Sequence, residues 1–344
     1  MLGRIFENLL EDNKDKGAFY TPKEIVQYMC RESLISYLQT DQREEDKECI
    51  RLFVSTHDAT LLGDLKEEIE QKLYNVKICD PAIGSGAFPM GLLRELFLCR
   101  SAIEPNIMEN AANIKRHIIQ NNIYGVDIER GAVDIARLRF WLALIVDEKS
   151  PEALPNLDFK IMQGNSLLEQ YKGVDLSTMT EKKVGTEQYI TIFDSMLDVY
   201  RKNLRDKLAE YYVCPNHDKK MLLRKDIADI VKQELIEQSI DIDFEDVDLS
   251  ANSQFFLWHT WFHDVFSRPS KEGFDIVIGN PPYVEAKKLK YIASTLKEKF
   301  SVYSGTADLS IYFNELGLNI LADKGIISYL SLIHISEPTR RSYI

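Results

Sequence analysis

The sequence predicts an α/β protein built on a doubly wound, mostly parallel sheet, with N-terminal helices and a helical insertion. From residue 76 onward, short apolar runs that end in small or acidic residues alternate with helical patterns, and this alternation stops once for about a hundred residues. Parallel strands covered on both faces are continuous apolar runs of this kind. The runs are VKICD (76–80), IYGVD (123–127), FKIMQ (159–163), FDIVIG (274–279) and GIISYL (325–330).

The composition is that of a globular protein with one large domain or two of ordinary size. The chain has 344 residues, of which 45% are hydrophobic and 28% charged, and this excludes disordered and fibrous classes. Its net charge is −12, so a nucleic-acid partner requires a local basic surface. The chain lacks a long uncharged apolar run and a signal-peptide pattern. We therefore expect a cytoplasmic protein that does not contact membranes.

The cysteines indicate neither a disulfide framework nor a metal site. They form an odd, scattered set without a CxxC pair, which is unlike the spacing of zinc ligands. We expect buried, reduced thiols and no bound metal. The five are Cys30, Cys49, Cys79, Cys99 and Cys214.

Residues 1–75 are predicted to form an N-terminal helical region. Thr21 is expected to be an N-cap, with Pro22 at the first helical position and Glu24 completing a capping box. The helix that starts there should run to about Leu38 and fix the preceding loop, GAFYTP. Residues 41–75 carry ten acidic and five basic side chains with helical spacing. We interpret this part as a solvated helical spacer.

Residues 76–170 contain a glycine-rich turn between a strand and a helix. The strand ends at Asp80, and Gly84 and Gly86 follow before the helix. Such glycines let the backbone approach a ligand, and the helix N-terminus offers free N–H groups; a tight turn without a ligand is the alternative. Asp127 ends the next strand, where a carboxylate binds ribose hydroxyls or caps a helix. The chain lacks the glycine pattern and acid spacing of a dinucleotide site, which argues against NAD.

Residues 171–254 are predicted to be an insertion, folded as a helical hairpin. The chain then returns to the sheet through an aromatic run, which we interpret as core packing and not as a base-stacking surface. This run is Phe255, Phe256, Trp258, Trp261, Phe262 and Phe266. Cys214 and His217 resemble half of a zinc-ligand pattern, but we interpret that segment as a solvent loop.

Residues 255–329 contain the most informative segment, a buried strand followed by Asn280, Pro281, Pro282 and Tyr283. The prolines stiffen the turn and remove two N–H donors, so the Asn280 side-chain oxygen and the Pro281 carbonyl can both act as acceptors. Two converging acceptors suit an –NH₂ group and release its lone pair for attack on an electrophilic methyl. Tyr283 offers a stacking face for a planar base. A rigid strand exit is the alternative.

These motifs, in the order FYTP, DPAxGSGxF and NPPY, resemble the N6-adenine DNA methyltransferases of the gamma motif order. The resemblance is greatest to the Eco57I-type restriction–modification methylases. It extends from about Leu2 to Tyr329 and is weakest over 40–75 and 171–250. It implies a class I fold that uses S-adenosylmethionine, with residues 76–170 as the cofactor-binding half and residues 255–329 as the catalytic half.

The resemblance also implies roles for individual residues. The motif over the methionine end of the cofactor corresponds to Phe19, Tyr20, Thr21 and Pro22. The motif that lines the amino-acid moiety corresponds to Asp80, Pro81, Ala82, Gly84, Gly86 and Phe88. Asp127 corresponds to the ribose-binding acid, and Asn165 with Ser166 to the adenine-binding motif, where the family usually has Asp. Asp308 is expected at a helix start, and Ser310 stands where Tyr is commoner.

The implied reaction is direct methyl transfer to an adenine flipped out of double-stranded DNA, with Asn280, Pro281, Pro282 and Tyr283 as the catalytic turn. It needs no metal and no covalent intermediate. Residues 286–300 hold five Lys and one Glu, and we expect Lys287, Lys288 and Lys290 either to contact DNA phosphates or to form a solvated helix face.

Two other functions remain open at this stage: a methyltransferase for a glutamine amide in release factors, and a non-catalytic DNA-binding or assembly module. The end of the chain is also unusual. The sequence LSLIHISEPTR within residues 330–344 matches the translation of a transposon-end sequencing adapter, so we expect a non-native tail. We further expect the family's target-recognition region to be missing after the methylase motifs. A nuclease domain of the complete protein would lie upstream of Met1.

Overall fold

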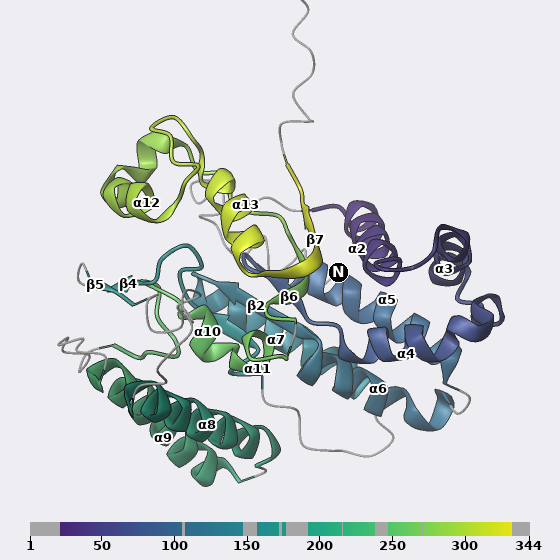
Figure 1. Ribbon diagram of the computed structural model, residues 1–344, viewed down its shortest axis with the longest axis horizontal. Coiled ribbons are helices and arrows are strands. Elements are labelled where there is room, and N and C mark those ends of the chain that lie inside the picture. Colours follow the sequence, from purple (N-terminus) through teal and green to yellow (C-terminus); the bar gives the residue numbers. More distant parts are fainter. Residues whose placement is uncertain are drawn as a thin grey trace, which may run out of the picture.

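A five-stranded parallel sheet forms the centre of the computed structural model (Figure 1). The structure describes residues 21–104, 107–146, 157–171, 174–176, 192–214, 216–237, 247–269 and 271–331. In sheet order the strands are β3 (Ile161–Gln163), β2 (Ile123–Asp127), β1 (Ile78–Asp80), β6 (Phe274–Gly279) and β7 (Leu321–Tyr329). Each lies in or overlaps one of the five apolar runs, so the predicted fold class is confirmed.

Two hydrophobic cores lie on opposite faces of this sheet. Ile78 and Ile276 belong to one core, whereas their neighbours Cys79 and Val277 belong to the other, because successive side chains of a strand point to opposite faces. The first core is completed by α2 to α7, and the second by the insertion, the aromatic run and α13. With helices on both faces, the sheet is doubly wound.

The order of the strands reverses at β1. From β1 the chain continues outward to β2 and β3, and then returns to place β6 on the other side of β1. Ile78 pairs with Ile123 on one side and with Ile276 on the other. In open parallel sheets ligands bind at the carboxyl ends of the strands where the order reverses. Here those ends are Asp80 and Gly279.

The N-terminal helices are α2 (Lys23–Leu38), α3 (Glu44–Thr56), η1 (Ala59–Leu65) and α4 (Lys66–Asn75). The predicted capping box is wrong. The N-cap of α2 is Pro22, without a side-chain capping bond, and the Thr21 hydroxyl instead accepts a hydrogen bond from the Asn280 amide. The Thr21 hydroxyl is therefore used in a contact with a residue distant in sequence, and not as the helix cap that the capping-box pattern predicted.

The acidic segment 41–75 is helical as predicted, but it is more than a solvated spacer. Phe53, Ile69 and Leu73 are fully buried in the same core as α2 and α5 (Ala87–Ile103). The acids occupy the outer faces of amphipathic helices. The core on this side of the sheet also contains residues of α6 (Ile107–Asn121) and α7 (Arg130–Ile145).

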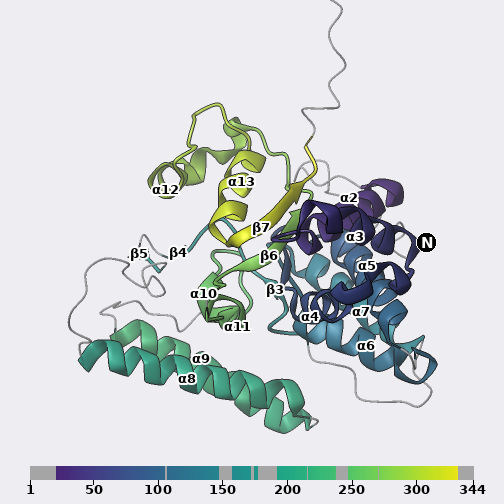
Figure 2. The same ribbon diagram turned by 45° about the vertical axis from the view of Figure 1, so that its right-hand side comes forward.

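Two long helices, α8 (Ile192–Val213) and α9 (His217–Glu237), fill the segment for which a hairpin was predicted. They pack along each other, away from α2 to α5 (Figure 2). The Tyr211 ring of α8 lies 5.0 Å from that of Phe159, and its hydroxyl donates to Asp158. These contacts attach the hairpin to the segment before β3.

A small antiparallel pair of strands, β4 (Gln170–Tyr171) and β5 (Val174–Asp175), precedes the hairpin in the chain.

The aromatic run contains α10 (Trp258–Trp261) and α11 (His263–Phe266) and packs in the core, as predicted. The Phe262 ring lies 5.1 Å from Tyr124 and 5.9 Å from Phe274. Beyond β6 come η3 (Ala286–Ile292), α12 (Ala293–Lys299) and α13 (Leu309–Asn319).

Four of the five cysteines are buried, Cys49 is half-buried, and all are free thiols. The interpretation of Cys214 as part of a solvent loop is wrong, because its thiol is buried and contacts the Asn216 carbonyl at 3.6 Å. Within the described residues, no cluster of His, Cys, Asp or Glu could hold a metal ion. No helix in the same residues has the length and apolar character needed to cross a membrane.

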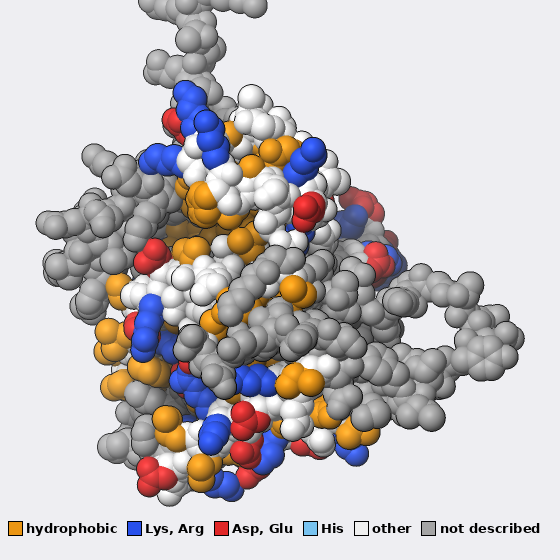
Figure 3. Space-filling view, turned by 90° about the vertical axis from the view of Figure 1, so that its left-hand side faces the viewer, with side chains coloured by type: hydrophobic (Ala, Val, Ile, Leu, Met, Phe, Trp, Pro, Cys, Tyr) orange, Lys and Arg blue, Asp and Glu red, His pale blue; other side chains and the backbone are white. Residues whose placement is uncertain are grey.

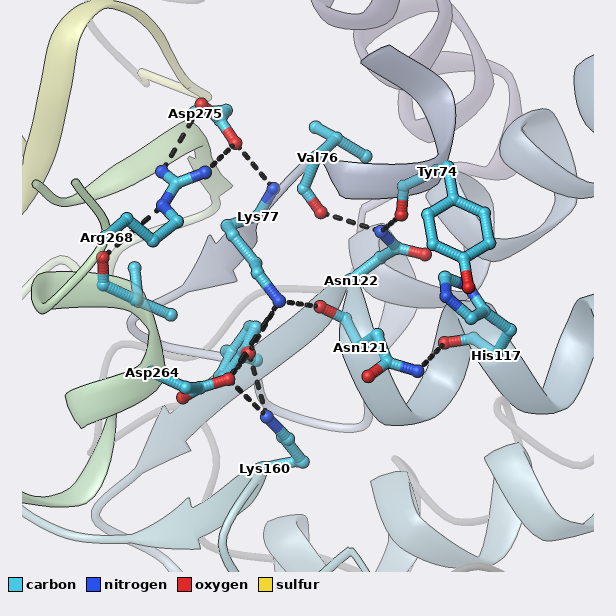
Figure 4. A network of polar contacts seen from close by, with 12 residues as sticks. Tyr74, Val76, Lys77, His117, Asn121, Asn122, Lys160, Asp264, Arg268 and Asp275 are labelled. Atoms are coloured by element: carbon cyan, nitrogen blue, oxygen red, sulfur yellow. Dashed lines mark hydrogen bonds and ion pairs between the residues drawn. The ribbon is translucent and has the colours of Figure 1, made fainter. Parts of the chain in front are cut away.

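A network of charged groups joins the amino ends of the strands (Figure 4). Lys160 Nζ lies 2.9 Å from Asp264 Oδ2 and 2.8 Å from the Tyr124 hydroxyl, and Lys77 Nζ lies 3.9 Å from the same carboxylate. Burial alone would raise the pKa of Asp264, but the two ammonium groups lower it to about 2. Burial also lowers the pKa of Lys77, to about 8. Asp264 is therefore the counter-charge of the buried Lys160 and of the half-buried Lys77.

We predict that Asp264→Asn lowers the free energy of unfolding at pH 7 by about 1 kcal/mol. The buried Lys160 loses its counter-charge, but the Asp264 side chain is 45% exposed, so solvent screens the pair. The folded-state pKa of Asp264 is depressed, so its contribution is present above the unfolded-state pKa and is lost as the pH falls from about 4 to 2. The difference between variant and wild type should shrink over that range. Urea titrations measure it, and Asp206→Asn, at an exposed position of α8, is the control. A variant as stable as wild type at pH 7 would contradict this prediction.

Candidate active site

The predicted cofactor and catalytic motifs meet at the carboxyl ends of β1 and β6. Asp80 ends β1 and is buried, and Gly279 ends β6 beside it. A Cβ atom at Gly279 would lie 2.6 Å from Asp80 Oδ1, so only glycine allows this approach. Asn280 follows directly. The sheet therefore brings together two motifs that are about 200 residues apart in the sequence.

The turn after β1 depends on two glycines in the left-handed region. Gly84 has φ +52° and Gly86 has φ +80°, and side chains there would be strained. Gly86 is also the N-cap of α5, so the first N–H groups of that helix lie next to the turn. Arg139 of α7 donates to the Ser85 carbonyl at 2.7 Å, which holds the turn from outside.

Asp127 connects this turn to the end of β2. Its Oδ2 accepts from the Gly84 N–H at 2.8 Å, and its Oδ1 accepts from the Glu129 N–H at 2.9 Å, just before α7. The carboxylate thus closes a turn just before α7 and fixes the glycine turn. It is not the cap of that helix, as the alternative interpretation proposed, because the N-cap of α7 is Glu129, which makes no side-chain capping bond. Asp127 therefore lies where the ends of β1 and β2 meet the glycine turn.

Asp80 is an acid in an unfavourable environment. Its carboxyl accepts from the Ala82 N–H at 3.1 Å. Burial raises the pKa of Asp80 well above its usual range, the Ala82 hydrogen bond partly offsets this, and the charge of Asp127 raises it further. A cation bound beside Asp80 would restore the charged form.

The segment after β3 contacts the same turn. Ser166 Oγ donates to the Pro81 carbonyl at 2.6 Å, and Trp258 Nε1 donates to the Ser166 carbonyl at 3.0 Å. Asn165 Oδ1 accepts from the Leu167 N–H at 3.2 Å, which sets the direction of its amide. The aromatic run therefore also positions Ser166, a role that the sequence did not indicate.

The Asn280–Tyr283 turn is held on several sides. Asn280 Nδ2 donates to Thr21 Oγ1 at 3.2 Å, and the Tyr283 hydroxyl donates to the Leu330 carbonyl. The Leu330 N–H in turn donates to the Gly279 carbonyl at 3.0 Å. The carbonyl of Val284, which follows Tyr283 in the chain, accepts from the Leu309 N–H at 3.0 Å. Leu309 is the first residue of α13, and Asp308 is the N-cap of that helix, as expected.

The remaining predicted residues lie in different places. Pro22 precedes α2 beside Thr21, whereas Phe19 and Tyr20 lie outside the described residues. Phe88 is buried in the core with α2, and its carbonyl accepts from the Cys30 thiol at 3.4 Å. Its side chain therefore packs between α5 and α2 in the core and does not line the glycine turn.

Sequence reasoning did not identify Arg139 or Leu330 as part of this site. Arg139 contacts a residue 54 positions away and Leu330 one 47 positions away, and neither lies in a recognisable motif. Leu330 uses only backbone atoms, so no sequence pattern could have revealed it.

The lysines after the catalytic turn lie on η3. Lys287, Lys288 and Lys290 are exposed. Lys and Arg side chains gather in the upper part of the face that includes η3 and α12 (Figure 3). A small cavity of about 130 Å³ lies beside them, lined in part by Leu289, Tyr303 and Tyr312. The surface next to the catalytic turn is therefore locally basic in an acidic protein.

The fold and these motifs together define a class I methyltransferase: a parallel sheet of this order, a glycine turn after its first strand and an Asn-Pro-Pro-Tyr turn after its fourth. The family model of the Eco57I restriction-modification methylases matches residues 121–340. The chain belongs to this family.

Two relatives extend the comparison. A Methanocaldococcus jannaschii protein named as a type II restriction enzyme and methyltransferase is 26% identical over 369 residues, which cover 82% of this chain and 30% of that protein. The adenine-specific methyltransferase BrxX of Escherichia coli is 20% identical over 365 residues, covering 96% and 28%. The chain thus spans less than a third of the length of either relative.

We predict that Asp80→Asn stabilises the ligand-free chain at pH 7 by about 1–2 kcal/mol, because it removes a buried acid whose pKa is raised. A raised carboxyl pKa gives stability that is lost as the pH rises above the unfolded value of about 3.9. The advantage of the variant should therefore grow from pH 4 to pH 7. Thermal unfolding over that range measures it, with Asp323→Asn, at an exposed position of β7, as the control. If the variant were less stable than wild type at pH 7, the prediction that the Asp80 carboxyl destabilises the ligand-free chain would be wrong.

Proposed function

We propose that the chain is the catalytic part of a DNA adenine N6-methyltransferase of a restriction–modification system, with S-adenosylmethionine as methyl donor. The observation that carries the proposal is the contact between the end of β6, which opens into Asn280, and Asp80, which opens the glycine turn. A nucleophile bound at the first would lie beside a cofactor bound at the second.

The residues around the glycine turn fit this cofactor. The turn at Gly84 and Gly86 and the N-terminus of α5 suit the polar carboxylate end, and the carboxylate of Asp127, at the end of β2, suits ribose hydroxyls. The buried Asp80 suits a cationic group such as the ammonium. The cofactor would supply an activated methyl on a cationic sulfur. We assign Phe19, Tyr20, Thr21, Pro22, Pro81, Ala82, Asn165 and Ser166 to the walls of this site, whereas Phe88 packs in the core beneath it.

The catalytic turn would act on the target amine through acceptors. The Asn280 side-chain oxygen and the Pro281 carbonyl would accept the two amine hydrogens, draw the lone pair out of conjugation and stabilise the developing positive charge. Pro282 would keep the turn rigid. The ring of Tyr283, fixed by its hydroxyl bond to Leu330, would stack on the adenine.

The names of the relatives support adenine in DNA as the substrate, since one is named as an adenine-specific methyltransferase and the other as a restriction enzyme and methyltransferase. The adenine would have to be flipped out of the duplex to reach Asn280. A DNA substrate would place the protein in the cytoplasm of a prokaryotic cell. We assign target recognition, and any cleavage, to parts of a longer polypeptide outside this chain.

The test is methyl transfer from labelled cofactor to unmethylated genomic DNA, with the modified base identified by mass spectrometry. We predict N6-methyladenine, and a loss of at least about 100-fold in rate for Asn280→Ala. Cofactor binding, measured by calorimetry, should persist in that variant because Asp80 and the glycine turn are intact. Asn75→Ala, at an exposed residue of α4, is the matched control.

Two results would overturn the proposal. Labelling of a release-factor glutamine with none in DNA would favour the protein-glutamine methyltransferase. Cofactor or DNA binding without transfer to either substrate would favour the non-catalytic module.

We also predict that alanine at Lys287, Lys288 and Lys290 weakens DNA binding. If each lysine contacts one phosphate, the slope of log affinity against log salt should fall by up to about 3, since each contact contributes about 0.9. Binding to a DNA duplex at several salt concentrations measures the slope.

The control for this prediction removes the same charge from the hairpin helix α9, at Lys219, Lys225 and Lys232. Its slope should match that of wild type. An unchanged slope in the η3 variant would instead assign the three lysines to a solvated helix face.

A further inference from the structure

Thr21 stands at the junction between the N-terminal region and the catalytic turn. Its side chain is buried, and its hydroxyl oxygen lies 3.2 Å from Asn280 Nδ2, across 259 positions of sequence. It is the third residue of the FYTP motif, directly before Pro22, but it makes no cap for α2. The hydroxyl is thus directed at the catalytic turn.

The contact matters because the two ends of a carboxamide have opposite hydrogen-bonding character. With Nδ2 held by Thr21, Oδ1 is on the other branch of the amide. If the amide turned over, it would present two N–H donors where an amine needs an acceptor. In the structure the Thr21 hydroxyl accepts from Nδ2, which corresponds to the productive orientation of Asn280. Because a hydroxyl can also donate, it favours this orientation as long as its own proton is directed away from the amide.

The position of Thr21 is itself fixed by the fold. Pro22 holds an extended conformation with φ −55° and ψ 143°, and α2 follows at once. That helix packs against α5, β6 and β7, and its Cys30 thiol donates to the Phe88 carbonyl at the start of α5. One helix thus links the Thr21 hydroxyl to the glycine turn and to the strand that carries Asn280.

We propose that Thr21 is a positioning residue for methyl transfer: its hydroxyl accepts a hydrogen bond from Asn280 Nδ2 and so directs Oδ1 to the target amine. The inference rests on the proposed function and deepens it. It gives the hydroxyl a role distinct from cofactor binding, which is the role that the FYTP motif would otherwise assign to it.

The test compares Thr21→Val, which keeps the shape and removes the acceptor, with Thr21→Ser, which keeps the acceptor. In Thr21→Val the half-buried Asn280 amide loses this hydrogen bond, so kcat should fall about 10- to 100-fold. The KM for S-adenosylmethionine and its Kd by calorimetry should stay within about two-fold. Thr21→Ser should recover most of kcat.

The control is Thr40→Val, beyond the C-terminal end of α2, whose hydroxyl makes an exposed bond to the Ser36 carbonyl. It should leave kcat unchanged. Thermal unfolding of every variant shows whether the fold is intact, and Thr21→Ala takes the place of Thr21→Val if valine impairs folding.

Three outcomes would overturn the inference. A weaker cofactor Kd with normal kcat at saturation would assign the hydroxyl to the cofactor. Equal kcat in the Thr21→Val variant and wild type would show that the hydrogen bond is not used. Absence of transfer by wild type would overturn the proposed function, and the inference with it.

Discussion

The close approach of two strand ends is the constraint on which the site depends. Asp80 and Gly279 are side by side because β1 and β6 are hydrogen-bonded neighbours at the point where the strand order reverses. The absence of a side chain at Gly279 leaves room for the Asp80 carboxyl. A larger residue would move either the acid or the turn that begins at Asn280. The geometry of both motifs thus depends on one contact, at which a Cβ atom on residue 279 would lie 2.6 Å from Asp80 Oδ1.

The acids at the two ends of the sheet have pKa values shifted in opposite directions. At the amino ends, Asp264 lies close to Lys160 and Lys77, and these ammonium groups lower its pKa to about 2 although burial opposes them. At the carboxyl ends, burial raises the pKa of Asp80, and Asp127 adds to the effect. Asp264 thus has lysine partners within the fold, whereas the charged form of Asp80 would be favoured by a cationic ligand. At pH 7 the lowered pKa of Asp264 therefore stabilises the fold, whereas the raised pKa of Asp80 destabilises it.

Much of this arrangement could be predicted from sequence, because strands and turns are encoded locally. The apolar runs identified all five strands of the parallel sheet, and the glycine and Asn-Pro-Pro-Tyr turns were predicted from the residues that follow β1 and β6. The N-cap at Thr21 was predicted wrongly for the same reason: the capping rule considers only neighbours, whereas the hydroxyl has a partner 259 residues away. Arg139 on Ser85 is a long-range contact of the same kind.

Backbone atoms make several of the contacts that hold the Asn280–Tyr283 turn. The contacting positions therefore need no particular side chain. Leu330 donates its N–H to Gly279 and accepts from the Tyr283 hydroxyl through its carbonyl, so almost any residue except proline could stand there. This holds even though residue 330 begins the segment that resembles an adapter translation. By contrast, Asp80, Gly279 and the Thr21–Asn280 pair act through the presence, absence or chemistry of a side chain. Relatives at 20–26% identity could therefore keep the geometry of the turn while most of its surroundings change.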